Sequence, residues 1–317
     1  MNFPIIFIII IILLTSYRPS FAFWVWTPET NKWVNPKYAV KETPAEQLAY
    51  ATEFFEAKEY DKAIAEFNKL IKHYPRSREA AEAQFHIGMA LEQNGQLFQA
   101  FKNYQLVIEK YPFSERAGEI VKKEFELGNK MLEGEEYRNK FMNAIAGGDY
   151  DVVEVFRTII KNAPYGEFAA PSQYKIGLYL QERQLYQESR DELEKVINDY
   201  PDSEWAKAAQ YQVALSDAKR SAEAQYDQVV TKTAVEEFKK FVEANPDTKL
   251  STKAQEHIHQ LREKEAENNF VIAEFYEKQK NYKAAKIYYS TVLEEFANTS
   301  WASKALQKMR ELSVKVQ

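Results

Sequence analysis

The sequence predicts an all-α fold, an α-solenoid of five to six helix pairs with a short aromatic N-terminal arm or hairpin. Three observations predict it. One helix-ending pattern, a proline followed two residues later by a helix-capping residue, recurs along the chain. Between these points apolar residues recur at helical spacing. Glycine and proline are scarce, with 9 and 11 residues among 317, which suits a chain of long helices.

The recurring pattern is clearest between Tyr60 and Ser77. Ala63 and Phe67 lie four residues apart and share one face of a predicted helix. Pro75 ends that helix, and Ser77 can cap the next. The same ending follows at 111–114, 163–166, 200–203, 245–248 and, in degenerate form, 296–299. Two of the intervals between caps are 37 residues and the others are longer. We take the shortest interval as the base period, and a period of this length indicates a helical repeat.

The first element is the arm, residues 23–42. Trp24, Trp26 and Trp33 alternate around a turn-rich centre, which favours a β-hairpin or an extended arm. Two interpretations are open for these three tryptophans. The arm packs on the first repeat, or it docks on a partner or a membrane surface.

The first two repeats have clear boundaries. Thr43 caps the first helix, Pro44 takes its first position and Glu46 its third. The second helix begins at Tyr60. In repeat two the chain turns at Asn94 and Gly95, where glycine can take the left-handed conformation that ends a helix.

The third repeat is longer than the others. We expect a helix from Ser114 to about Leu132, a break at Gly134, and a second piece from Tyr137 to Ala146. A turn at residues 147–149 then leads into a helix at 150–162. The two glycines there predict a turn and not a phosphate loop, because no Gly-Lys-Ser/Thr follows them.

The remaining repeats follow the same rules. Repeat four is compact, with its second helix beginning at Tyr186. Repeat five opens with a long helix from Glu204 to about Tyr226, and repeat six with a helix from Leu250 to about Lys280, which is ~45 Å long at 1.5 Å per residue. A terminal helix, 300–316, closes the array with a polar outer face.

Small residues stand eleven positions after three of the caps, at Gly88, Gly177 and Ala214. At such positions a close neighbouring helix leaves room only for a small side chain. This pattern, with the helix pairs and their period, resembles the tetratricopeptide repeat (TPR).

The N-terminus indicates export. An isoleucine-rich run from Phe3 to Leu14 is followed by Ser20-Phe21-Ala22, the small-x-small form of a signal-peptidase site. About 12 apolar residues are too few to span a bilayer, which needs ~20. We therefore expect a cleaved signal at 1–22, an arm at 23–42, an N-terminal array at 43–163 and a C-terminal array at 164–317. An uncleaved anchor is the alternative for the first segment.

Composition and motifs disfavour several functional classes. The net charge is −5 with both signs interspersed, which disfavours nucleic acid as a partner. With no cysteine there is no thiol nucleophile and no lipoprotein acceptor, so we expect a chain that is not a lipoprotein. His257 and His259 diverge by roughly 200° on a helix and cannot share one metal. We expect no enzyme activity, no metal, no cofactor and no small-molecule substrate.

Residues from Thr43 to Val316 resemble the BamD-like tetratricopeptide proteins of the outer-membrane β-barrel assembly machinery. By analogy with that architecture, the first helices line a peptide-binding groove, whose positions lie three before, one after and four after each small residue. The candidate residues are Leu48, Thr52, Phe55, Phe85, Met89, Glu92, Tyr174 and Leu178, with Gln181 beside them. Such a groove is apolar and aromatic, and suits an extended or helical segment. The alternative for each residue is packing against adjacent helices.

The resemblance implies a non-enzymatic periplasmic scaffold, peripheral at the outer membrane. Its early repeats would receive the aromatic-ended sorting signal of unfolded barrel proteins, and its later repeats would hold partner subunits such as a BamA-like barrel insertase. We expect Phe55→Ala with Phe85→Ala to weaken client binding without unfolding the protein. Two alternatives stay open, a scaffold for cell division or peptidoglycan synthesis and a recruiting subunit of an envelope enzyme.

Overall fold

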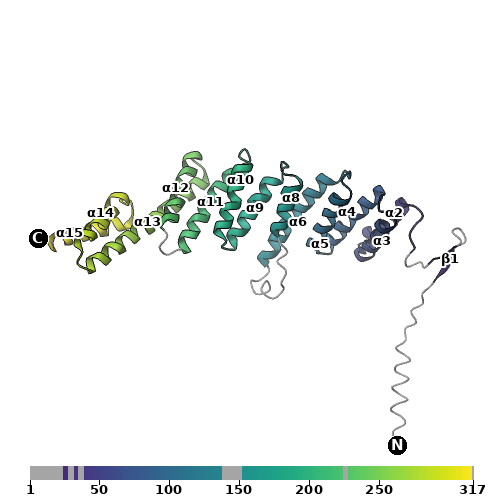
Figure 1. Ribbon diagram of the computed structural model, residues 1–317, viewed down its shortest axis with the longest axis horizontal. Helices are drawn as coiled ribbons and strands as arrows, with labels where there is room; N and C mark the ends of the chain where they lie inside the picture. The colour runs from purple at the N-terminus through teal and green to yellow at the C-terminus, as the bar shows by residue number, and fades with distance from the viewer. Residues whose placement is uncertain (1–23, 28–31, 35–38, 138–151, 224–227, 316–317) are drawn as a thin grey trace, which may run out of the picture. The chain divides into compact units, whose positions relative to one another are not determined.

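A computed structural model describes residues 24–27, 32–34, 39–137, 152–223 and 228–315 (Figure 1). The predicted signal segment 1–22, the turn at 147–149 and most of the expected second helix piece of repeat three lie outside these ranges. Two short strands, β1 (Val25–Thr27) and β2 (Lys32–Val34), form an antiparallel hairpin in which Trp26 pairs with Trp33. The predicted hairpin is therefore confirmed.

Helices make up almost all the rest of the described chain. They are α2 (Pro44–Glu56), α3 (Tyr60–His73), α4 (Arg78–Gln93), α5 (Leu97–Lys110), α6 (Ala117–Tyr137), α8 (Val152–Asn162), α9 (Ala169–Glu182), α10 (Tyr186–Asp199), α11 (Glu204–Glu223), α12 (Gln228–Ala244), α13 (Lys249–Lys278), α14 (Tyr282–Glu295) and α15 (Ser300–Lys315). Within the described residues this makes six helix pairs and a closing helix, the predicted all-α tetratricopeptide-type solenoid.

The predicted caps set most of these boundaries. The side-chain oxygens of Thr43, Ser77 and Thr248 each accept a hydrogen bond from the backbone N–H three residues on, at the starts of α2, α4 and α13. The chain turns after α3, α5 and α10 at a tyrosine followed by proline. Proline has no backbone N–H to continue the helix, so local chemistry alone fixes these ends.

The expected break at Gly134 is wrong. Helix α6 runs without interruption from Ala117 to Tyr137. A single glycine within a helix costs only about 1 kcal/mol relative to alanine, and that is too little to end a helix already held by tertiary contacts. Those contacts lie one to two turns earlier, where Leu127 is fully buried and Gly128 packs on Phe156.

Small residues let the paired helices approach closely. A β-carbon at Gly88 would stand 2.5 Å from the ring of Tyr104, and one at Gly177 would stand 2.5 Å from Leu193. Ala214 is fully buried. The predicted need for a small side chain is thus confirmed at Gly88 and Gly177. Gly128 has the same role, with Phe156 only 2.8 Å from a built β-carbon, and the cap spacing did not indicate it.

The chain divides into two compact units, Met1–Ala117 and Gly118–Gln317. In the first, Phe67 and Leu70 of α3 are fully buried between α2 and α4. In the second, one core lies around Phe238 in α11–α13 and another around Tyr289 in α13–α15. Helices α8 and α9, on either side of the boundary expected at 163/164, contact each other within the second unit. That boundary stays a prediction.

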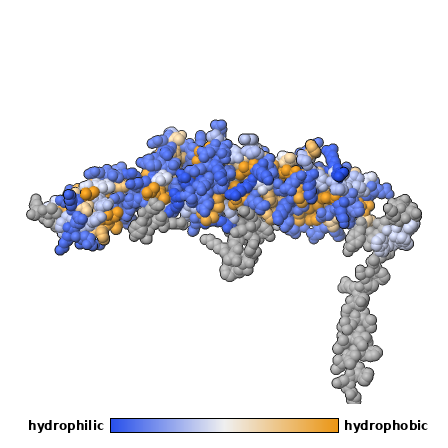
Figure 2. Space-filling model, viewed as in Figure 1, coloured by the Kyte–Doolittle hydropathy of each residue, from blue (hydrophilic) through white to orange (hydrophobic). Residues whose placement is uncertain are grey.

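Surface character is mixed. Figure 2 shows apolar side chains interspersed among hydrophilic ones on the visible face of the described helices. Among the helices that the structure describes, none combines the length and the apolar character that crossing a bilayer requires.

Candidate protein-binding surface

The first helix of each pair has a particular place in the stack. Helix α2 contacts α4, α9 contacts α11, and α13 contacts both α11 and α15, in addition to the contacts between helices adjacent in the chain. The first helices therefore approach one another across successive repeats. The candidate residues lie on α2, α4 and α9, which are first helices of their pairs.

On α2, three candidate residues lie at the surface in part. Leu48 and Phe55 are half-buried and pack against the core of the first unit. The ring of Phe55 meets those of Tyr60 and His86 edge-on, with centroids 5.6 Å and 5.8 Å away. The Thr52 hydroxyl donates to the Leu48 carbonyl oxygen at 2.9 Å, so this threonine presents its methyl group and an acceptor oxygen.

On α4, the structure separates the three candidates. Phe85 is 1% exposed, with its ring on Tyr104 (centroids 5.4 Å apart) and the Arg116 guanidinium 4.7 Å from its centre. Glu92 is buried and accepts a hydrogen bond from the Tyr104 hydroxyl at 3.2 Å. Both side chains belong to helix packing, which corrects their expected place on the surface. Met89 is half-buried and remains available.

In repeat four, the candidates are largely engaged inside the protein. The ring of Tyr174 lies against Trp205, with centroids 5.2 Å apart. Burial raises the pKa of its phenol, and a hydrogen bond with Gln212 opposes that shift. Gln181 is buried and donates to the Ser216 hydroxyl at 2.9 Å. Leu178 is half-buried. The surface with accessible apolar groups is thus formed by Leu48, Thr52, Phe55 and Met89, which we call the α2–α4 face.

A glutamine in three first helices binds the second helix of its own pair. The side-chain amides of Gln47, Gln84 and Gln173 donate to Glu66, Asn103 and Glu192 respectively, always 19 residues further on. Gln173 also donates to the Glu192 backbone oxygen at 3.0 Å. This feature was not among the predictions from the sequence. Its signal is a glutamine four residues before each small residue at 51, 88 and 177.

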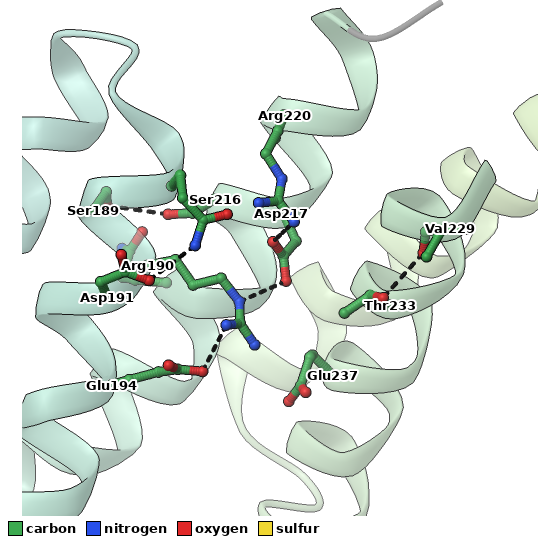
Figure 3. A network of polar contacts seen from close by, with 12 residues as sticks. Ser189, Arg190, Asp191, Glu194, Ser216, Asp217, Arg220, Val229, Thr233 and Glu237 are labelled. Atoms are coloured by element: carbon green, nitrogen blue, oxygen red, sulfur yellow. Dashed lines mark hydrogen bonds and ion pairs between the residues drawn. The ribbon is translucent and has the colours of Figure 1, made fainter. Parts of the chain in front are cut away.

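A buried charged network joins α10 and α11 (Figure 3). Asp217, which is 1% exposed, lies 3.0 Å from Arg190 Nε and 3.0 Å from an Arg220 nitrogen. Arg190 also reaches Glu194 at 2.8 Å. Burial raises the pKa of the Asp217 carboxyl, although both arginines favour its ionised form. Nothing in the sequence pattern distinguished Asp217 from the many charged residues that face water.

The tryptophans of the hairpin are exposed. Trp24 is 55%, Trp26 41% and Trp33 62% exposed. The rings of Trp26 and Trp33 meet edge-on with centroids 5.7 Å apart. Because Trp26 pairs directly with Trp33, these two indoles share one face of the hairpin, and Trp24 stands two residues before Trp26, just ahead of β1.

These features define the class. The chain is a tetratricopeptide-repeat protein, in which stacked helix pairs present helix faces for protein contacts. A model of the tetratricopeptide repeat matches residues 50–77 and 82–114. The chain belongs to the YfiO family, described as outer membrane lipoprotein, whose model matches residues 151–316. Proteins of these two families are non-enzymatic scaffolds, and those similar to BamD mediate protein contacts in outer-membrane assembly.

Individual relatives agree with that assignment. The chain is 25% identical over 161 residues to the outer membrane protein assembly factor BamD of Caulobacter vibrioides. The match spans 51% of this chain and 53% of the relative, about half the length of each.

Similar solved structures include two bacterial repeat proteins. One is the C-terminal part of a TPR repeat-containing protein from Cytophaga hutchinsonii, with 14% identity, a TM-score of 0.37, and coverage of 83% of this chain and 88% of that one. The other is a tetratricopeptide repeat protein from Parabacteroides merdae, with 11% identity, a TM-score of 0.35, and coverage of 86% and 100%.

Proposed function

We propose that this chain is a periplasmic scaffold of the outer-membrane β-barrel assembly machinery, which binds unfolded barrel-protein segments and partner subunits. The observation that carries the proposal is the family match over residues 151–316, together with the similarity to an assembly factor. A scaffold requires accessible apolar surface, and both units of the described chain have it.

In the first unit, the client surface is the α2–α4 face. Leu48, Phe55 and Met89 combine apolar area with partial exposure. The ring of His86 on α4 meets that of Phe55 on α2, and its Nδ1 contacts the Glu82 carbonyl oxygen within α4 at 2.8 Å. This arrangement suits a bulky side chain of an extended segment, which binds by burying apolar area and completing aromatic contacts.

In the second unit, α13 carries an exposed apolar pair. Val271 and Phe275 lie four residues apart on the same side of the helix and are 53% and 57% exposed. Pairs at this spacing are the anchors by which helices contact partner proteins. We assign this pair to a partner subunit, and the α2–α4 face to the client.

The partner assignment is tested by crosslinking intact envelopes, purifying the tagged chain and identifying the retained proteins by mass spectrometry. A BamA-like barrel insertase at near-stoichiometric yield is the expected result. Replacement of Val271 and Phe275 by serine should reduce that yield without lowering the melting temperature. Retention of division, cell-wall or hydrolase proteins without any barrel protein would overturn the proposal.

The client assignment needs a separate measurement, because the two surfaces lie in different units. A labelled peptide from the last strand of a barrel protein, ending in an aromatic residue, is titrated with the purified chain. We expect Phe55→Ala with Met89→Ala to weaken binding at least about fivefold, the loss of about 1 kcal/mol of apolar contact. Phe113→Ala is the matched control, since Phe113 is 99% exposed in the same unit. Equal affinities for all three proteins would refute the client surface.

A further inference from the structure

The five tryptophans of the chain fall into two groups. Trp205 and Trp301 lie within the repeats, are half-buried, and pack on Tyr174 and Phe270 with centroids 5.2 Å and 5.1 Å apart. The hairpin indoles of Trp24, Trp26 and Trp33 are 41–62% exposed. The hairpin therefore presents three large aromatic side chains to its surroundings, and an exposed apolar cluster of this kind marks an interaction site.

The chemistry of that cluster favours a lipid surface. An indole has an apolar body and one N–H donor, and it concentrates at the level of the lipid headgroups, where one end is apolar and the other wet. The two-stranded hairpin places the rings of Trp26 and Trp33 next to each other, with centroids 5.7 Å apart. Over the arm, residues 23–42, three lysines stand against two glutamates, although the whole chain carries −5. This local positive charge complements anionic headgroups.

A second observation concerns the sequence itself. The family is described as outer membrane lipoprotein, yet none of the 317 residues is a cysteine, so no residue of this sequence offers a thiol for a lipid chain. We propose that the aromatic face of the β1–β2 hairpin binds the surface of a phospholipid bilayer. This proposal goes beyond the assembly function and does not depend on it.

The segment between the hairpin and α2 limits how far α2 can lie from a bilayer to which the hairpin is bound. Nine residues, 35–43, separate the hairpin from α2. At about 3.4 Å per residue they span at most ~30 Å. A hairpin seated in the headgroup region would keep the start of α2 within that distance of the bilayer.

The proposal is tested by sedimentation with vesicles. The chain from Phe23 onward is mixed with vesicles of phosphatidylethanolamine and phosphatidylglycerol, because this form lacks the isoleucine-rich run that would bind lipid by itself. The test variant carries Trp24→Ser, Trp26→Ser and Trp33→Ser. The control variant carries Phe113→Ser and Tyr165→Ser, which remove aromatic rings that are 99% and 98% exposed but lie outside the hairpin.

We expect the hairpin variant to partition onto vesicles at least about tenfold less than the parent, and the control variant to partition as the parent does. Replacing the anionic lipid by phosphatidylcholine should weaken the parent's binding as well. Equal sedimentation of parent and hairpin variant overturns the proposal. So does loss of a crosslinked protein partner in the hairpin variant with vesicle binding unchanged, because the face would then be a protein contact.

Fluorescence supplies an independent readout. In a Trp205→Phe and Trp301→Phe background, the tryptophan emission comes only from the three hairpin indoles. Vesicles should shift this emission to shorter wavelength, and lipids brominated near the headgroup should quench it. Unchanged emission would contradict insertion. If that background fails to fold, as judged by circular dichroism, sedimentation of the native-background variants decides the question.

Discussion

The α-carbon of Gly88 lies so close to Tyr104 that an added β-carbon would stand 2.5 Å from the ring. Tyr104 is fully buried, and its hydroxyl donates to Glu92, so the ring has little freedom to move. We expect Gly88→Ala to destabilise the protein by about 1–3 kcal/mol through overpacking. Thermal unfolding followed by circular dichroism measures this loss of stability.

Gly134→Ala is the matched control for that substitution. Gly134 lies in α6 with nothing within 4 Å of a built β-carbon. There alanine should raise the stability by about 0.5–1 kcal/mol, because it lowers the entropic cost of forming the helix. An equal effect of the two substitutions would show that the close approach at Gly88 is not what excludes alanine.

Phe85 and Phe55 should differ in the cost of truncation. Phe85→Ala removes a buried ring from its place between Tyr104 and Arg116, and we expect a loss of about 3–5 kcal/mol. Phe55→Ala removes a half-buried ring, and we expect about 1–2 kcal/mol. Denaturant unfolding of the two variants gives the comparison. The assignment of Phe85 to the core fails if its truncation costs no more than that of Phe55.

Four turns within helix pairs share one backbone conformation. Lys58, Gly95, Gln184 and Lys280 all have positive φ, between 57° and 74°, and each follows the small residue of its pair by seven positions. Residues other than glycine pay roughly 1–2 kcal/mol for this left-handed region. Lys58→Gly should therefore raise the melting temperature, with a gain of about 0.5–1 kcal/mol, whereas Gly95→Ala should lower it. A lower melting temperature for Lys58→Gly, or a higher one for Gly95→Ala, would refute the equivalence of the turns.

Glu192 should make the stability depend on pH. Burial alone would raise the pKa of its carboxyl. Hydrogen bonds from Lys195 and Gln173 and the charges of Lys195 and Arg157 outweigh burial, so the pKa lies below its usual value of 4.5. A lowered pKa in the folded state stabilises the protein above pH 4.5, and this stabilisation is lost as the pH falls below that value through the folded-state pKa.

We therefore expect Glu192→Gln to be less stable than the parent at pH 7, with a difference that shrinks as the pH falls from 4.5 towards 3. Glu188→Gln removes the same charge from an exposed position on α10 and serves as control. Melting curves at several pH values provide the measurement. A difference independent of pH would show that the carboxylate charge is not what stabilises this contact.

Local chemistry made most of the helix boundaries predictable. Proline after tyrosine ends α3 and α5, and Thr43 and Ser77 cap the helices that begin after them. The predicted break at Gly134 does not occur, because a local preference of about 1 kcal/mol is too small to end a helix that tertiary contacts hold.

The site was less predictable than the fold. The analogy that placed Phe85 on the surface gives the helix face but not the side chain's neighbours, and Tyr104 and Arg116 enclose that ring. Asp217 was assigned no role because a carboxylate at helical spacing looks like any solvated one. Only the approach of α10 to α11 shows that Arg190 neutralises it in the interior.

The hydrogen bonds of Gln47, Gln84 and Gln173 end within the same helix pair in which they begin. A duplication or deletion of a whole pair in the gene would carry both partners of the bond together, whereas one that begins within a pair would separate them. The array can therefore gain or lose length in evolution by complete pairs, because each pair contains both partners of its own glutamine hydrogen bond.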